Sequence, residues 1–245
     1  MMTQFYPLLK REFLGYFRSP VAYVFIVIFL LSSVGFTFFI GNLYESNQAH
    51  LMPFFVYLPW LYLVLVPAVG MRLWAEERRT GTIELLFTLP VNMHEAVLAK
   101  FVAGWAFLGV ALFLTFPLLI TINYLGEPDN GVIMASYLGS FLMAGSYLAV
   151  SCVTSAFTKN QVISFILGVI ICFIMVLLGW GVFTEALSAV FPTAIVDGIA
   201  SLGFMTHFNG IARGLIDSRD LLYFASVIFV ALALNTMILN TRKAN

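Results

Sequence analysis

The sequence is poor in charge: only 10% of its 245 residues are Asp, Glu, Lys or Arg, whereas a soluble domain carries about 25%. Hydrophobic residues make up 61%, so the composition indicates a membrane protein. Basic and acidic residues balance at 12 each, which gives no overall attraction to nucleic acid. Both cysteines, Cys152 and Cys172, lie in apolar runs, which argues against a disulfide framework. The three histidines are far apart in the sequence, so no metal site is expected.

The sequence also lacks the patterns that would let it use energy by itself. It has no glycine-rich loop ending in Gly-Lys-Ser or Gly-Lys-Thr, so it cannot bind ATP by that route. No apolar run carries an ionisable residue near its middle, where ion-coupled carriers usually place one. An ion-coupled carrier is therefore disfavoured. We expect a non-catalytic chain with no cofactor of its own, in which transport would need a second subunit to supply energy.

Six apolar runs are long enough to cross a bilayer, which takes about 20 residues in a helix. They are Val21–Ile40, Phe54–Arg72, Val97–Tyr124, Val132–Ala156, Val162–Phe183 and Leu221–Leu239. The first run has no small-residue cleavage site, so it predicts a permanent anchor. The fourth run repeats small residues at helical spacing, which predicts a central position because small side chains let helices approach closely. These residues are Ala135, Ser136, Gly139, Ser140, Ala144, Gly145 and Ala149.

Lys and Arg are distributed unevenly between the two sides that six spans define. Only Arg213 and Arg219 fall on the side opposite the termini. The other ten are Lys10, Arg11, Arg18, Arg72, Arg78, Arg79, Lys100, Lys159, Arg242 and Lys243. Because the side richer in Lys and Arg stays in the cytoplasm, both termini and the loop after the second span are predicted to be cytoplasmic.

Residues 1–20 precede the first span and have the pattern of an amphipathic helix. Their apolar side chains recur at helical spacing and are Phe5, Leu8, Leu9, Phe13 and Tyr16. Lys10, Arg11 and Arg18 fall on the other side of that helix. Such a helix is predicted to lie on the membrane surface, in contact with lipid.

The densest internal charge lies between the second and third spans, in the stretch Arg72–Glu95. A buried charge costs a few kcal/mol or more in lipid, so this stretch must lie at a membrane surface. We expect the second span to continue as a helix to Arg79 and the chain to turn at Gly81. A short helix should follow, capped by Thr82, with Glu84 in its first turn and its end before Pro90.

The third span should then begin with a capping box formed by Asn92 and Glu95. A short helix held between two membrane helices is a contact surface. The alternative is a solvated charged loop whose only role is to orient the protein in the membrane.

The segment from 184 to 220 is too apolar for a loop and too interrupted for a span. We expect two short helices that dip into the outer leaflet without crossing it, broken at Pro192 and at a turn formed by Asp197 and Gly198. The alternative is a further pair of spans, which Asp197 interrupts. The charged residues that follow predict a polar outer rim, with Asp217 capping the sixth span, in preference to a substrate site. The rim consists of His207, Arg213, Asp217, Arg219 and Asp220.

Three stretches together resemble the ABC-2 type transporter permeases. The loop EERRTGTIELLFTLPV (Glu76–Val91), followed by Lys100, is similar to the signature loop of that family. The start KREFLGYFRSP (Lys10–Pro20) resembles the family's amphipathic N-terminal helix. The stretch HFNGIARGLIDSRDLLYF (His207–Phe224) is similar to its gliding-motility and copper-delivery branch.

The resemblance implies a single ABC-2 type transmembrane domain over residues 1–245. Residues 1–20 would form the interfacial helix, 21–183 the first five spans, 184–220 the outer re-entrant segment, and 221–245 the sixth span and a cytoplasmic tail. The expected location is a bacterial inner membrane. The implied partners are a cytoplasmic ABC ATPase dimer that binds ATP and magnesium, a second permease copy and an extracytoplasmic accessory protein.

The resemblance also assigns coupling to the ATPase to the loop after the second span. The residues concerned are Glu76, Glu77, Arg78, Arg79, Gly81, Thr82 and Glu84. The expected function is export of a lipid, glycan, peptide or drug-like molecule. The alternative is a membrane anchor that transmits mechanical work and moves no solute. Stimulation of ATP hydrolysis by a substrate would distinguish the two.

Overall fold

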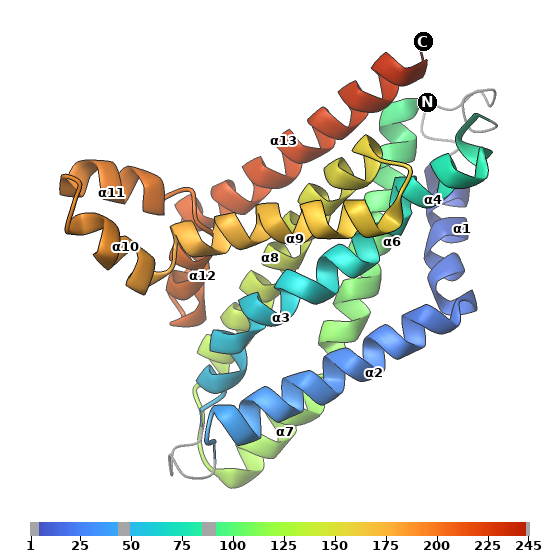
Figure 1. Ribbon diagram of the computed structural model, residues 1–245. Coiled ribbons are helices and arrows are strands. Elements are labelled where there is room, and N and C mark those ends of the chain that lie inside the picture. Colours follow the sequence, from blue (N-terminus) through green and yellow to red (C-terminus); the bar gives the residue numbers. More distant parts are fainter. Residues whose placement is uncertain (1–4, 44–49, 85–91, 244–245) are drawn as a thin grey trace.

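The computed structural model describes residues 5–43, 50–84 and 92–243, with side chains up to Thr241, as helices joined by short turns (Figure 1). The described residues contain no strand, so the all-helical class is confirmed. The helices in chain order are α1 (Phe5–Arg18), α2 (Pro20–Gly35), the π-helical turn η1 (Phe36–Ile40), α3 (Met52–Gly70), α4 (Arg72–Thr80), α6 (Met93–Phe113), α7 (Phe116–Leu125), α8 (Asn130–Phe157), α9 (Gln161–Leu178), α10 (Gly181–Ser188), α11 (Thr193–Ala200), α12 (Phe204–Ala212) and α13 (Ser218–Lys243). The predicted helix end before Pro90 lies outside the described residues.

Six helical stretches among these residues are long and apolar enough to cross a membrane, which confirms the predicted number. They are Pro20–Ile40, Met52–Thr80, Met93–Leu125, Asn130–Phe157, Gln161–Leu178 and Ser218–Thr241. The fifth stretch ends at Leu178, before the predicted Phe183, because the chain turns where two glycines meet. A Cβ atom on Gly203 would overlap the backbone of Gly179, so only glycine allows this approach.

Helix α8 occupies the centre of the bundle, as its small residues predict. All seven of those residues are buried. A Cβ atom on Gly145 would lie 2.8 Å from the Trp105 ring of α6, and one on Gly139 would lie 2.7 Å from Ile211 of α12. Neighbouring helices therefore pack directly on the α8 backbone.

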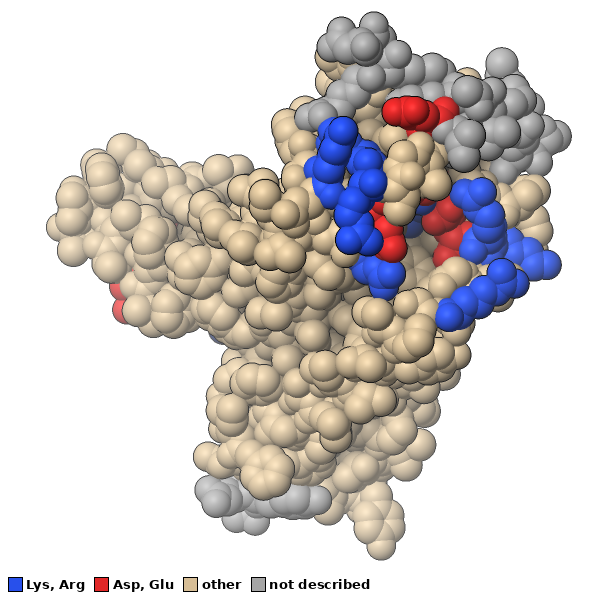
Figure 2. Space-filling model, turned by 45° about the vertical axis from the view of Figure 1, so that its right-hand side comes forward, with Lys and Arg blue, Asp and Glu red and all other residues tan. Residues whose placement is uncertain are grey.

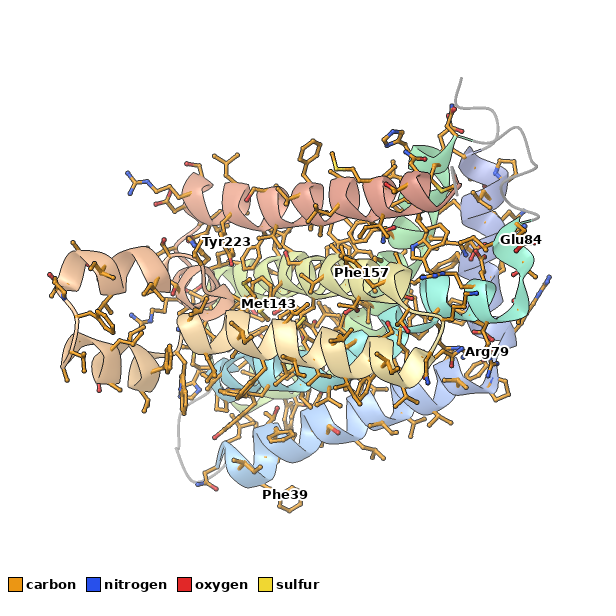
Figure 3. All side chains as sticks on the ribbon, turned by 45° about the horizontal axis from the view of Figure 1, so that its top comes forward. Phe39, Arg79, Glu84, Met143, Phe157 and Tyr223 are labelled. Carbon is orange, nitrogen blue, oxygen red and sulfur yellow. The ribbon has the colours of Figure 1, made fainter. Side chains whose placement is uncertain are left out.

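The two ends of the bundle differ in what lies on them. Helices α1 and α4 lie at one end, where α1 crosses the ends of the spanning helices (Figures 1 and 3). Helices α10 and α11 project from the opposite end. Each has 8 residues, or about 12 Å of helix, which is too short to cross a bilayer. The placement of α1 on the membrane surface and of α10 and α11 in the outer leaflet stays a prediction.

One of the two breaks predicted between residues 184 and 220 is found, and the other lies elsewhere. The break at Pro192 is confirmed, since Pro192 directly precedes α11. The turn predicted at Asp197 and Gly198 is wrong, because both residues lie inside α11 and the chain turns at 201–203 instead. Asp197 is exposed, so a helix accommodates its carboxylate without burying it. A further helix, α12, follows and packs against α8 through Phe204, Phe208 and Ile211.

Candidate functional site

The charged stretch after the second span is a direct helical continuation of that span. Helix α4 begins only one residue after α3 ends, and its Leu73, Trp74 and Ala75 are buried. The predicted extension of the second span to Arg79 is therefore confirmed. Gly81 ends α4 with φ = 74°, a left-handed conformation that favours glycine, so the predicted turn is also confirmed.

A clamp holds the junction of α3 and α4 against α8. The Ser155 hydroxyl of α8 donates to the Met71 carbonyl at 2.9 Å and accepts from the backbone N–H groups of Trp74 and Ala75 at 3.0 Å. One turn further along α4, the Arg78 guanidinium donates to the Ala156 carbonyl at 2.6 Å. These contacts attach α4 to the end of α8.

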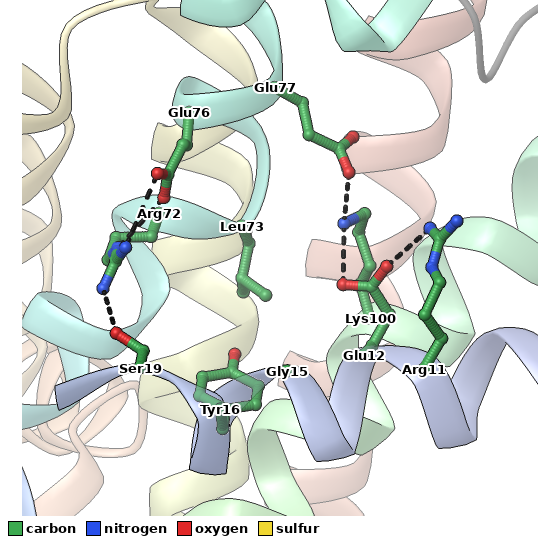
Figure 4. Close-up of a pocket in the computed structure, with 10 residues that line it drawn as sticks. All are labelled: Arg11, Glu12, Gly15, Tyr16, Ser19, Arg72, Leu73, Glu76, Glu77 and Lys100. Atoms are coloured by element: carbon green, nitrogen blue, oxygen red, sulfur yellow. Dashed lines mark hydrogen bonds and ion pairs between the residues drawn. The ribbon is translucent and has the colours of Figure 1, made fainter. Parts of the chain in front are cut away.

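A buried lysine connects α4 with two other helices (Figure 4). Lys100 of α6 places its ammonium nitrogen 3.0 Å from a carboxylate oxygen of Glu12 in α1 and 2.7 Å from one of Glu77 in α4. Its side chain is only 4% exposed. The same nitrogen lies 5.3 Å from the centre of the Trp74 ring, within range of a cation–π interaction. We call Glu12, Lys100 and Glu77 the three-helix ion cluster.

The cluster is electrostatically balanced by a fourth residue. Arg11 lies 2.8 Å from Glu12, so two basic groups face two carboxylates. Burial raises the pKa of the Glu12 carboxyl, but Lys100 and Arg11 outweigh burial and hold that pKa below its ordinary value. A charge removed from water is tolerated only where it is paired, and Lys100 meets this condition through two partners.

Aromatic packing fixes α1 in the position that the cluster requires. The Tyr16 ring stacks on Phe107 of α6 with centroids 4.8 Å apart, and the Phe17 ring meets the edge of the same Phe107 at 5.8 Å. None of the side chains of α1 is fully buried, so this seam and the Glu12 ion pair attach the helix. Part of the predicted apolar face of α1 therefore packs against α6.

A cavity of about 350 Å³ lies between α1 and α4 beside this cluster. On its other side, Arg72 lies 3.0 Å from Glu76 and 3.4 Å from the Ser19 hydroxyl. Figure 2 shows the basic and acidic side chains gathered at this end of the molecule, around a hollow. The cavity is thus lined by groups of both charges.

The predicted coupling residues separate into two groups in space. Glu77 and Arg78 point inward, to Lys100 and to the end of α8, and Glu76 pairs with Arg72. By contrast, Arg79, Gly81, Thr82 and Glu84 are exposed, and Arg79 and Glu84 lie at the extreme end of the molecule (Figure 3). We call Arg79, Thr82 and Glu84 the α4 tip.

Two predicted helix caps near this site are not formed as expected. The helical turn after Gly81 begins at Thr82 itself, so Thr82 is its first residue and not its cap. The Thr82 hydroxyl instead donates to the Glu77 carbonyl at 3.4 Å. Asn92 does precede α6, but its side chain contacts the Glu95 carboxylate at 3.5 Å and makes no cap hydrogen bond.

Sequence reasoning placed Lys10, Arg11 and Arg18 on an exposed face of α1, where all three are found. It missed the roles of Glu12, Lys100 and Ser155. A signal existed for Lys100, which is the one basic residue inside an apolar helical run, AVLAKFV. It was used only for the orientation of the protein and as part of the stretch that resembles the family's loop.

The outer rim residues lie at the opposite end and join two helices. His207 of α12 lies 2.7 Å from the Asp220 carboxylate of α13, and its other ring nitrogen lies 2.9 Å from the Ser201 carbonyl. Asp217 accepts from the Arg219 backbone N–H at 3.0 Å, which agrees with its predicted capping role. This hydrogen bond lowers the pKa of the Asp217 carboxyl. Arg213, Asp217 and Arg219 are exposed.

Comparison with known proteins identifies one family. Residues 8–179, more than half of the chain, match the family described as "ABC-2 family transporter protein". No curated protein matches the chain significantly. The matched range includes most of α1 and all of α4 and α6, and thus every residue of the three-helix ion cluster. Within the described residues, no group of His, Cys, Asp or Glu side chains could hold a metal ion.

Proposed function

Because the chain belongs to the ABC-2 family of transporter proteins, we propose that it is the membrane-spanning permease subunit of an ABC exporter. Permeases of this family in general form dimers and have an ABC ATPase partner. ATP and magnesium would bind in that partner. The exported molecule would be a lipid, glycan, peptide or drug-like compound. The uneven distribution of Lys and Arg supports an orientation with both termini and the α4 tip in the cytoplasm. The proposed location, a bacterial inner membrane, rests on the family.

The observation that carries the proposal is the attachment of the α4 tip to the rest of the bundle. The tip consists of Arg79, in the last turn of a helical stretch that runs from Met52 to Thr80, and of Thr82 and Glu84 in the turn that follows Gly81. Behind it, α4 is clamped to α8 through Ser155 and Arg78, and joined to α1 and α6 through Lys100. A force applied to the tip is therefore delivered to the central helix of the bundle and to the helix that lies across its end.

The mechanism follows from these attachments. When the ATPase subunits close on ATP, they would displace the α4 tip. The tip, α4 and α8 would move together because the Ser155 clamp and the Arg78 hydrogen bond connect them. Lys100 would carry the displacement to α1 and α6. The outcome would be a two-state shift of packed helices that opens or closes a path between the two permease copies.

Charge reversal at the α4 tip tests the proposal. Arg79→Glu combined with Glu84→Lys changes two exposed side chains and leaves the ion cluster intact. We expect the variant to insert normally but to lose binding to the ATPase subunit, because juxtaposed like charges at an interface cost several kcal/mol. The matched control is Arg219→Glu with Glu185→Lys, two exposed residues at the opposite end. Wild-type ATPase binding and turnover in the tip variant would refute the proposal.

A further inference from the structure

The charged cavity at the α4 end continues into a second, apolar cavity of about 200 Å³. The two share Tyr16, Ser19 and Arg72 in their walls. The walls of the second cavity are otherwise formed by apolar side chains, mainly of α2 and α3, such as Val24, Ile28 and Leu65. Together the two cavities reach the size range of ligand sites in proteins, about 300–1,000 Å³.

The junction of the two cavities coincides with the boundary between the apolar and charged parts of the chain. Helix α2 begins at Pro20, directly after Ser19, and α3 ends at Gly70, two residues before Arg72. Val24 and Ile28, which line the apolar cavity, are 56% and 45% exposed within the candidate span Pro20–Ile40. In a bilayer the apolar cavity would lie at the depth of the acyl chains, and the charged cavity at the depth of the lipid headgroups.

This arrangement selects an amphiphile as the occupant. A water-soluble metabolite would leave the apolar cavity empty, and a soluble partner protein cannot reach into the membrane. An apolar chain alone would leave the charged cavity unused. A phospholipid matches both parts, because its phosphate lies between its acyl chains and the remainder of its headgroup.

The charges at the junction favour a headgroup that carries both signs. The Arg72 guanidinium and the Ser19 hydroxyl belong to residues that line both cavities, whereas Glu76 lines the charged cavity alone. The side chains of Arg72 and Glu76 are 34% and 37% exposed. An exposed pair of this kind contributes little to stability, so exchanging it for contacts with a ligand costs little.

We propose that the joined cavities bind one zwitterionic phospholipid of the inner leaflet, with phosphatidylethanolamine as the fitting headgroup. An acyl chain fills the apolar cavity, the phosphate accepts from Arg72 and Ser19, and the ammonium group donates to Glu76. The bound lipid touches α1, α2, α3 and α4, so it stabilises the attachment of the interfacial helix. The proposal concerns a bound lipid, and its test uses neither ATP nor an ATPase subunit.

Native mass spectrometry of the full chain provides the test. The protein is released from bilayer nanodiscs that contain equal amounts of phosphatidylethanolamine, phosphatidylcholine and phosphatidylglycerol. We expect one phosphatidylethanolamine to be retained per chain, several-fold in excess over the other two. Ala68→Trp fills the apolar cavity and should abolish retention. The control, Ile170→Trp, introduces the same ring at an exposed position of α9 and should leave retention unchanged.

Two polar variants test the headgroup contacts independently of the cavity. Arg72→Gln should reduce retention of every phospholipid about tenfold, because it removes a charge-assisted hydrogen bond. Glu76→Gln should shift retention from phosphatidylethanolamine toward phosphatidylglycerol, an effect that a purely structural role would not produce. Equal retention of phosphatidylglycerol by the wild type, or unchanged retention in Ala68→Trp, would overturn the proposal. So would unchanged headgroup preference in Glu76→Gln.

Discussion

Replacing Lys100 by Met tests whether the three-helix ion cluster holds α1 and α4 on α6. The substitution removes the ammonium group that lies 3.0 Å from Glu12 and 2.7 Å from Glu77, and it keeps an unbranched side chain of similar length. Removing one partner of a buried ion pair costs about 3–5 kcal/mol, because the other charge is left unpaired. Glu12 and Glu77 are 19% and 21% exposed, so water relieves part of this cost. We therefore expect a loss near the lower limit, about 3 kcal/mol.

A triple variant separates the cost of unpaired charge from the cost of lost packing. Replacing a whole buried ion-pair cluster by apolar residues of similar volume is often nearly neutral. Lys100→Met with Glu12→Met and Glu77→Met should thus recover most of the stability that Lys100→Met alone loses. Lys159→Met, at an exposed position in the turn between α8 and α9, is the control and should change stability by less than about 0.5 kcal/mol.

Equilibrium unfolding in mixed detergent micelles measures these differences, with tryptophan fluorescence as the signal. Trp74 is a suitable reporter because it is buried beside Lys100. A stability of Lys100→Met within about 0.5 kcal/mol of the wild type would refute the reasoning. If the triple variant is as unstable as Lys100→Met, the loss of stability comes from lost packing and not from an unpaired charge.

Three further predictions concern orientation, acidity and the Ser155 clamp. An impermeant thiol reagent should label Asn130→Cys from outside the cell and should not label Thr80→Cys. Labelling of the native cysteines should be low because Cys152 and Cys172 are buried. Labelling of Thr80→Cys from outside would reverse the assigned orientation. The native pKa of the Glu12 carboxyl lies below its ordinary value of 4.5. The ionised carboxylate therefore stabilises the fold at pH values above 4.5. This stabilisation is lost as the pH falls through the lowered pKa. Unfolding measured from about pH 8 to pH 3 should therefore show a loss of stability at the acid end that is smaller in Glu12→Gln, and an identical profile would contradict the lowered pKa. Ser155→Ala should cost about 1–3 kcal/mol in the same unfolding assay, whereas Ser140→Ala, whose hydroxyl bonds only to Ser136 of its own helix, should cost less; equal costs would argue against the clamp.

The six spans could be predicted because hydropathy and length are local properties of the chain. The position of α8 could be predicted for the same reason, since its small residues recur within one helix. Gly81 was also a local signal, because a left-handed turn favours glycine wherever the remainder of the chain lies.

The three-helix ion cluster could not be predicted, because its parts lie far apart in the sequence. Glu12 and Lys100 are 88 positions apart, and their contact depends on how α1 lies against α6. Glu77 belonged to a run of four charged residues, and only the rotation of α4 decides which of these face inward. The turn predicted at Asp197 was wrong because a single charge in an apolar segment breaks a helix only where the helix would bury that charge, and Asp197 is exposed.

The proposed mechanism requires the α4 tip to move together with α8 when ATP binds to the partner subunit. Spin labels on cysteines at Thr80 and Lys159, both exposed, report the distance between α4 and the end of α8 within one permease. Labels at Thr80 of both permease copies report the distance between the two tips. In the complex with the ATPase subunits, we expect ATP to change the tip-to-tip distance and to leave the distance from Thr80 to Lys159 unchanged. A change in the distance from Thr80 to Lys159, with the tip-to-tip distance constant, would contradict the claim.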